Sequence, residues 1–159
     1  MSKSFRLSGY VSHVGRKLAL GVSDGDVFNA AVQLDETIDD GAAVTPLIGT
    51  YPGALESINV EIGKLRLKLQ ATHLSKISKR IDEPYAYILE AQLIHADDDG
   101  AHMRGTLEII LMQRTDAAPL DDDDSLAPPM IAHYKDKHWR IWLAVEGGAT
   151  DKIEGPLNL

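Results

Sequence analysis

The clearest chemistry in this sequence is a cluster of basic side chains in the middle of the chain. Between positions 64 and 80 every charged side chain is basic, and the cluster consists of Lys64, Arg66, Lys68, Lys76, Lys79 and Arg80. Lysine and arginine gathered on one surface can follow the phosphates of a nucleic acid or bind the carboxylates of a protein. The cluster therefore predicts a surface that binds an anionic partner.

Aromatic side chains extend this predicted surface and suggest one such partner. Tyr85 closely follows the basic cluster, while Arg140 and Trp142 stand two residues apart, which places both on one face of a strand. Proteins hold single-stranded nucleic acids by stacking bases on aromatic rings beside a basic groove. Single-stranded nucleic acid is therefore one candidate partner for the first three basic residues and these rings.

The acidic residues of the chain favour a different partner. The net charge is −8, which repels a polyanion, and two runs of aspartate lie at 97–99 and 121–124. These runs can pair with the basic cluster of a neighbouring copy. We expect a binding or assembly protein that acts through protein–protein contacts or self-association. Single-stranded nucleic acid binding is the alternative, and a small barrel enzyme or ligand binder is the third interpretation.

Motifs for catalysis and cofactors are weak. Positions 21–25 match G-x-S-x-G, but a nucleophile elbow at Ser23 needs a following helix, whereas Asp24 and Gly25 are typical of a hairpin turn. The chain has no cysteine, which excludes disulfides and thiolate chemistry. It also has no glycine-rich phosphate or dinucleotide motif. We expect no enzymatic activity and no cofactor.

Histidines and two glutamates raise further possibilities. His95 with His102 flank the first aspartate run, and His133 with His138 flank a second turn, but their spacings match no metal motif. We expect no metal site. Glu90 and Glu108 lie within apolar strands, where an inward carboxylate would suit acid–base catalysis. We expect both to face solvent instead.

The elements that position these residues are mostly strands. Leu65, Leu67 and Leu69 alternate with cations, which predicts a half-buried strand after a turn or bulge at Gly63. The apolar spacing within 72–82 predicts a short helix, and the alternative is that the strand simply continues to Ile77. Further strands are expected at 5–14, 17–22, 27–34, 85–95 and 104–114, with a final hairpin of 130–134 and 138–145.

Residue parity in the last strand separates core from surface. We expect one face to be core, formed by Trp139, Ile141, Leu143 and Val145. The opposite face would then carry His138, Arg140 and Trp142.

These patterns predict a mainly β protein. An antiparallel β-barrel, OB-like or a related small barrel, fits best because closure removes exposed edges, and a β-sandwich is the alternative. We expect one or two short helices and one domain at 1–146, with a mobile acidic loop at 115–129 and a flexible tail at 147–159. No apolar run is long enough to span a membrane as a helix. Together with the missing cysteine, this leads us to expect a cytoplasmic protein.

Overall fold

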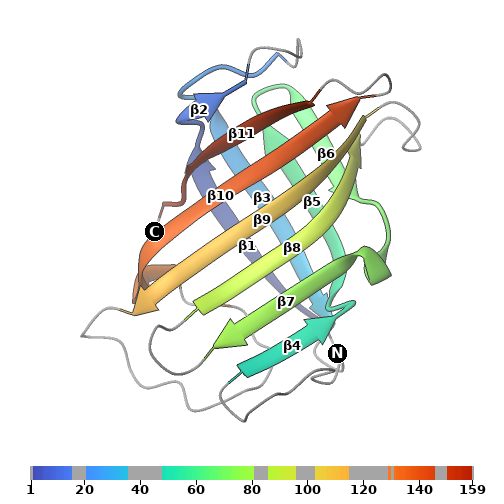
Figure 1. Ribbon diagram of the computed structural model, residues 1–159, viewed down its shortest axis with the longest axis vertical. Helices are drawn as coiled ribbons and strands as arrows, with labels where there is room; N and C mark the ends of the chain where they lie inside the picture. Colours follow the sequence, from blue (N-terminus) through green and yellow to red (C-terminus); the bar gives the residue numbers. More distant parts are fainter. Residues whose placement is uncertain are drawn as a thin grey trace.

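The computed structural model is built on one antiparallel sheet that curls around a common core (Figure 1). The structure describes residues 2–15, 21–35, 48–80, 86–95, 103–114, 129, 131–145 and 150–158. Its strands are β1 (Ser2–Tyr10), β2 (His13–Val14), β3 (Val27–Asp35), β4 (Ile48–Pro52), β5 (Leu55–Ile62), β6 (Leu65–Leu69), β7 (Ser75–Arg80), β8 (Ala86–His95), β9 (Met103–Arg114), β10 (Tyr134–Val145) and β11 (Thr150–Pro156).

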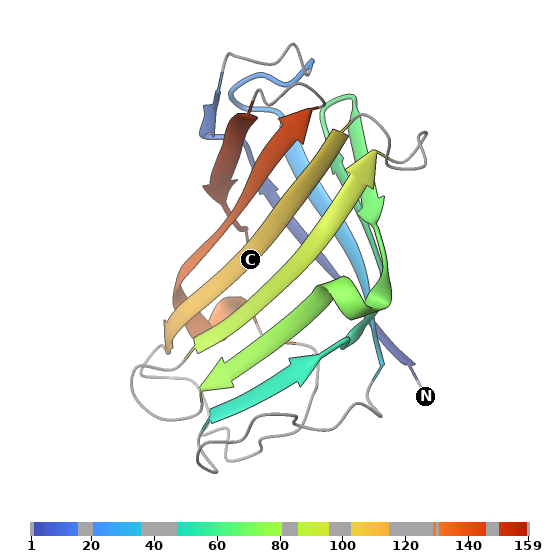
Figure 2. The same ribbon diagram turned by 45° about the vertical axis from the view of Figure 1, so that its right-hand side comes forward.

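The order of the strands brings the two ends of the sheet together. Along the sheet the order is β1-β3-β5-β6-β8-β9-β10-β11-β2, and β4 and β7 pair beside β8. A bridge between Gly9 and Leu157 then joins β1 to the segment after β11. In Figures 1 and 2 the layer of β7 to β10 crosses in front of the layer of β1, β3, β5 and β6. The expected mainly β, antiparallel and barrel-like fold is confirmed.

Two glycines allow the ends of the sheet to approach closely. A methyl group at Gly155 would overlap the carbonyl oxygen of Tyr10, and one at Gly9 would overlap the carbonyl oxygen of Pro156. Both obstacles are backbone atoms, which cannot rotate away. Closure of the sheet at this seam therefore depends on residues without a Cβ.

Residues 48–80 form one long hairpin with an irregular middle. β5 pairs with β6 across the turn at Gly63 and Lys64, where Gly63 has a φ of 57°, and farther from the turn β4 pairs with β7. Between β6 and β7 lies η1, a short 3-10 helix at Thr72–Leu74. The predicted helix at 72–82 is therefore wrong beyond its first turn. The alternative is also incomplete, because β6 ends at Leu69 and a separate strand follows η1.

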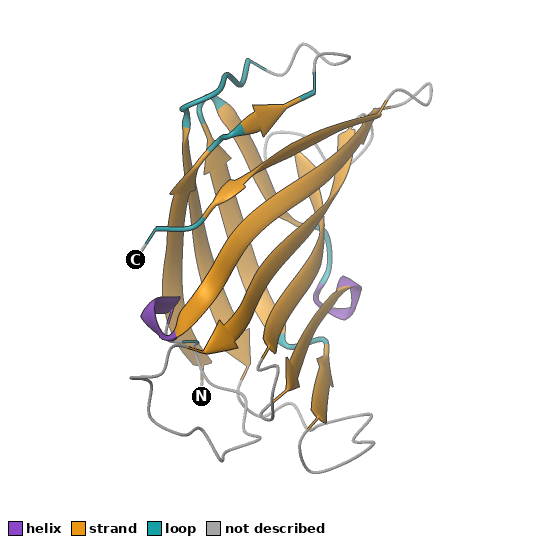
Figure 3. Ribbon diagram, turned by 60° about the vertical axis from the view of Figure 1, so that its left-hand side comes forward, coloured by secondary structure: helices purple, strands orange, loops and turns teal. Residues whose placement is uncertain are grey.

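The two short helices lie at the margins of the sheet (Figure 3). They are η1 and η2, the latter at Ile131–His133, and both are 3-10 helices of three residues. Ile131 of η2 packs against the core. η2 leads directly into the long strand β10. The predicted final hairpin of 130–134 and 138–145 is therefore wrong, since 134–145 is one continuous strand paired with β9. Among the described residues, no helix is long and apolar enough to cross a membrane.

The core follows the predicted parity of the last strand. Trp139, Ile141 and Leu143 are buried, while Trp142 is 47% exposed on the other face. The Trp139 ring stacks on Phe28 from the opposite layer, with centroids 4.2 Å apart and planes 9° from parallel. The parity prediction is confirmed for these residues.

Two further expectations about the chain ends need correction. The segment 147–159, expected as a flexible tail, contains β11, which pairs with β10 along seven residue positions from His138 to Ala144. The sequence does not predict this strand because its inward positions include the polar Asp151 and the small Gly155 beside Ile153. Lys152 and Glu154 face outward. The strand expected at 5–14 is divided into β1 and β2.

Some predictions concern residues that lie outside the described part of the chain. These are the acidic loop at 115–129 apart from Pro129, the aspartate run at 97–99, residues 17–20 of a predicted strand, Tyr85 and His102.

Candidate binding surface

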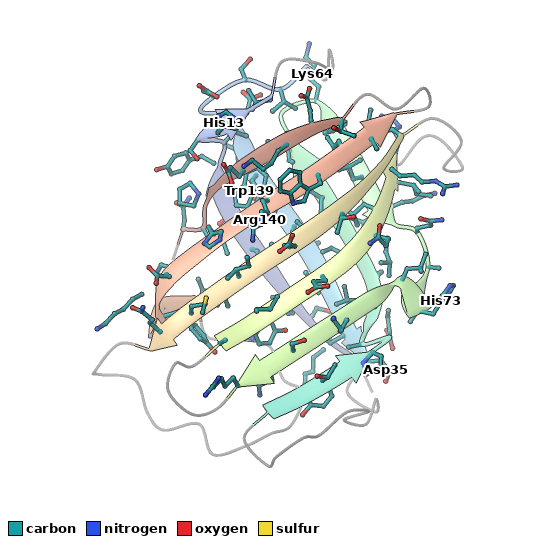
Figure 4. All side chains as sticks on the ribbon, in the orientation of Figure 1. His13, Asp35, Lys64, His73, Trp139 and Arg140 are labelled. Atoms are coloured by element: carbon teal, nitrogen blue, oxygen red, sulfur yellow. The ribbon has the colours of Figure 1, made fainter. Side chains whose placement is uncertain are left out.

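The predicted basic cluster does not form one surface. Lys64 lies in the exposed turn at one end of the molecule, far from Arg140 on the middle of β10 (Figure 4). Lys76 and Arg80 belong to β7, which η1 separates from β6. Lys79 has the opposite parity and points inward with an exposure of only 7%. Its predicted place on the binding surface is therefore wrong, because β7 is a strand and alternates its side chains between two faces.

The two predicted cations of β6 have different neighbours. Arg66 and Glu61 form an exposed pair, with 3.8 Å between Nε and Oε1. Exposed pairs of this kind contribute little to stability, so Arg66 stays accessible to a partner. Lys68 is half-buried on β6 beside Asn59 of β5.

A ladder of charged side chains of both signs crosses the outer face of the sheet, and we call it the charge ladder. It runs through Lys76, Glu90, Glu108, Arg140 and Glu154, which are direct cross-strand neighbours on β7 to β11. Within it the Lys76 Nζ lies 3.7 Å from the Glu90 Oε2, and the Arg140 Nη2 donates a hydrogen bond of 3.3 Å to the Glu108 Oε2. Glu90 and Glu108 thus face outward, as expected. Arg140 is therefore already paired with a carboxylate, which weakens its predicted role as a cation that binds a phosphate.

A hollow on the same outer face has a different character. We call it the Trp142 hollow: it has a volume of about 350 Å³ and is lined by Gln92, Arg104, Gly105, Thr106, Trp142, Leu143, Ala144 and Thr150. The small side chain of Ala144 leaves room beside the indole, whereas Gly105 is opposite Leu143 and faces the core. The Thr106 hydroxyl donates a hydrogen bond of 3.1 Å to the Gln92 Oε1. None of the described residues that line it is acidic.

Cations from three strands surround the Trp142 hollow. Lys152 lies beside Trp142 on β11, with its Nζ 5.1 Å from the ring centroid and 3.3 Å from the Glu154 Oε1. Arg104 is exposed on β9. Lys68 of β6 is opposite Ile94, which is itself opposite Arg104. Two strand spacings put the Cα atoms of Lys68 and Arg104 about 10 Å apart. The hollow therefore combines an exposed indole with a cationic border.

Sequence reasoning identified only part of this arrangement. Trp142 and Lys68 were predicted site residues, whereas Arg104 and Lys152 were missed. Only the pairing of strands places these two cations near Trp142: Arg104 is opposite Ala144, and Lys152 is opposite Trp142. Alternation within one strand gives the face of a residue but not its partner on the next strand.

A second hollow lies on the outer face of β1, β3 and β5. It has a volume of about 280 Å³, and its lining includes Ser4, Arg6, Ala31, Gln33, Ser57 and Asn59. The Ser57 hydroxyl donates a hydrogen bond of 3.4 Å to the Gln33 Oε1. Phe5 and Val32 also line it, but Val32 is buried and Phe5 is partly buried against the core, so its described lining has no ring as exposed as that of Trp142.

The candidate catalytic and metal residues have ordinary surroundings. The Ser23 backbone N–H donates a hydrogen bond of 2.9 Å to the Asp26 Oδ2, and the turn at Asp24 and Gly25 leads into a strand and not a helix. Within the described ranges no group of three or more His, Asp or Glu side chains could hold a metal ion. The side chain of His133, one of the proposed ligands, lies outside that description.

One titratable group in the core is strongly perturbed. Complete burial, with a smaller contribution from Tyr134, raises the pKa of Tyr87 far above its ordinary value. The Tyr87 hydroxyl and the Trp139 Nε1 are buried without a hydrogen-bond partner among the described residues. Tyr87 therefore stays neutral and is not an acid or base available to a surface ligand.

Comparison with known proteins adds no constraint on function. No family model, curated protein or solved structure matches this chain.

Proposed function

We propose that this chain is a non-catalytic protein-binding module whose contact centre is the Trp142 hollow. The observation that carries the proposal is the indole of Trp142, which is 47% exposed at the edge of a hollow of about 350 Å³. Tryptophan and arginine dominate the energetic centres of protein interfaces, where they fill or border pockets. Trp142 beside Arg104 has this composition.

The surroundings of the hollow support a protein partner. Gln92, Thr106 and Thr150 offer neutral hydrogen-bonding groups next to the apolar ring. The charge ladder, which lies one residue row away, carries both signs across five strands. An apolar centre with a polar rim of mixed charge is the usual composition of a protein interface, whereas a nucleic acid requires a continuous basic path.

The first experiment measures partner binding with matched variants. Proteins captured by the wild-type chain are identified, the partner is purified, and its affinity is measured for wild type, Trp142→Ala and Tyr10→Ala. Tyr10 is the control because it is 46% exposed but lies on β1. Loss of a central tryptophan should weaken binding by roughly 30-fold or more, which corresponds to about 2 kcal/mol. Tyr10→Ala should change the affinity less than about threefold.

Two results would contradict this proposal. One is a partner whose affinity is unchanged by Trp142→Ala, since the hollow would then lie outside the interface. The other concerns nucleic acid, because Trp142 with Lys68, Arg104 and Lys152 also resembles a stacking platform. Fluorescence anisotropy with a labelled oligothymidine should show no binding at low micromolar concentration. Tight binding that weakens steeply with salt and is lost in Trp142→Ala would favour the nucleic-acid function instead.

A further inference from the structure

We propose that the Trp142 hollow binds the acidic segment 120–126 of a second copy of this chain, so that the protein self-associates. This inference rests on the proposed function and names the partner of the same site. The segment reads LDDDDSL, with Leu120 and Leu126 on either side of four consecutive aspartates. It is the most concentrated negative charge in the chain.

The chemistry of the segment complements that of the hollow. Trp142 offers an exposed apolar face for a leucine. The Arg104 guanidinium already makes an interaction of its own, but it is exposed and has five N–H donors, so it can also donate to a carboxylate of a second copy. Lys152 and Lys68 add positive charge nearby, although Lys152 already shares its charge with Glu154. Among the described residues, no carboxylate lines the hollow to repel the aspartates.

Other outer surfaces of the described chain fit this segment less well. The charge ladder contains Glu90 and Glu108 as direct neighbours, and both would repel aspartates. The hollow on β1, β3 and β5 has Arg6, but the ring in its described lining, that of Phe5, is partly buried against the core and offers less apolar surface to a leucine than Trp142 does. The combination of an exposed aromatic ring with several cations is found at the Trp142 hollow.

Contour length disfavours the same contact within one chain. The segment lies between the end of β9 and the start of β10, which are paired with each other and lie at the far end of these strands from the hollow. Each of its four aspartates is at most eight residues from either Arg114 or Ile131. Eight residues span at most about 29 Å. Trp142 is opposite Thr106, eight residues or about 26 Å from Arg114 along β9, and Arg104 is ten residues or about 33 Å away. Within one chain the segment would therefore have to be almost fully extended in both directions to reach the hollow. A second copy has no such limit.

Two copies can satisfy both contacts at once. The hollow and the acidic segment belong to opposite ends of the same two strands, β9 and β10. If β10 of one copy runs antiparallel to β10 of the other, each segment meets the hollow of its partner. A reciprocal contact of this kind closes as a two-fold dimer and leaves no free end. The expected species is therefore a dimer.

Complementation between two variants tests the proposal. The hollow variant carries Trp142→Ala and Arg104→Glu, and the segment variant carries all four Asp→Asn changes at 121–124. Analytical ultracentrifugation in 0.15 M salt should show a wild-type dimer and at least a tenfold larger dissociation constant for each variant alone. An equimolar mixture of the two, with different fluorescent labels, should recover heterodimers, because one intact hollow then meets one intact segment.

A matched control checks that the effect is specific. Tyr10→Ala with Arg6→Glu makes the same kinds of change on β1 and should leave the dimer intact, and circular dichroism should show that all variants are folded. A wild-type monomer at 100 micromolar, dimers that persist in both variants, or no heterodimer on mixing would each overturn the inference. A monomeric wild type with another protein partner that depends on Trp142 would refute self-association alone. No effect of Trp142→Ala on either kind of binding would refute the proposed function as well.

Discussion

The two tryptophans of this chain show how parity divides roles at the scale of single residues. Trp139 is fully buried and stacks on Phe28, whereas Trp142, three residues later, is 47% exposed and contacts Lys152. They belong to one strand, so the difference follows from the alternation of side chains. One ring supports the fold, and we assign the other to binding.

Alanine substitution should separate these two roles. Trp139→Ala removes a large buried ring and should lower the free energy of unfolding by about 3–5 kcal/mol. Trp142→Ala loses partial burial and an exposed cation–π contact, so a cost of roughly 1 kcal/mol is expected. Urea denaturation followed by circular dichroism measures both. Equal losses in the two variants would refute the assignment of faces.

Tyr87 predicts an unusual response to a conservative change. Its hydroxyl is buried without a partner among the described residues, so Tyr87→Phe removes an unsatisfied polar group and should leave stability at neutral pH unchanged or up to about 1 kcal/mol higher. A loss above about 1 kcal/mol would show that the hydroxyl is bonded.

The raised pKa of Tyr87 adds a pH dependence to the same comparison. In the unfolded chain a tyrosine ionises near pH 10, while in the folded protein burial keeps Tyr87 neutral to a higher pH. The contribution of neutral, buried Tyr87 to the free energy of unfolding is therefore fully present below about pH 10 and is lost as the pH rises further. Chemical denaturation between pH 8 and pH 11 should show a smaller alkaline loss of stability for Tyr87→Phe than for wild type.

At the scale of elements, the sequence predicts a strand correctly where one face of the strand is polar and the other is apolar. The run from Leu65 to Leu69 and the strand around Trp139 are of this kind, and both were predicted. β7 was predicted as part of a helix, with a strand that continues to Ile77 as the alternative, because its inward face carries Ser75 and Lys79 beside Ile77. Leu74 and Ile77 then matched a helical spacing as well. β11 was missed for a similar reason, since Asp151 and Gly155 occupy inward positions.

Closure of the sheet gives a prediction for the glycines at the seam. In Gly155→Ala the new methyl group meets the Tyr10 carbonyl, so β1 and β11 must separate, at a cost of roughly 1–3 kcal/mol or more. Hydrogen exchange should accelerate in β11 and β2. Gly25→Ala is the control: it has open space around its Cβ but a φ of +88°, so it should cost about 1 kcal/mol and leave β11 protected. Unchanged exchange in Gly155→Ala would contradict the close crossing.

At the scale of the whole molecule, the candidate site is a product of register. Lys68, Arg104, Trp142 and Lys152 come from four strands and gather because β6, β8, β9, β10 and β11 are neighbours in that order. The alternation of residues predicted that Trp142 faces outward. It could not predict which strands pair with β10, and so it could not predict the neighbours of Trp142. The predicted basic cluster failed as one surface for the same reason, since η1 separates β6 from β7 and the parity of β7 turns Lys79 inward.

The most direct test of the central claim is to observe Trp142 while the protein binds. Incorporation of fluorotryptophan gives two fluorine NMR signals, because the chain has two tryptophans, and Trp142→Phe assigns them. We predict that the Trp142 signal shifts when a second copy or another partner binds, while the signal of the buried Trp139 stays in place. Binding that leaves the Trp142 signal unchanged would contradict the claim that the Trp142 hollow is the contact centre.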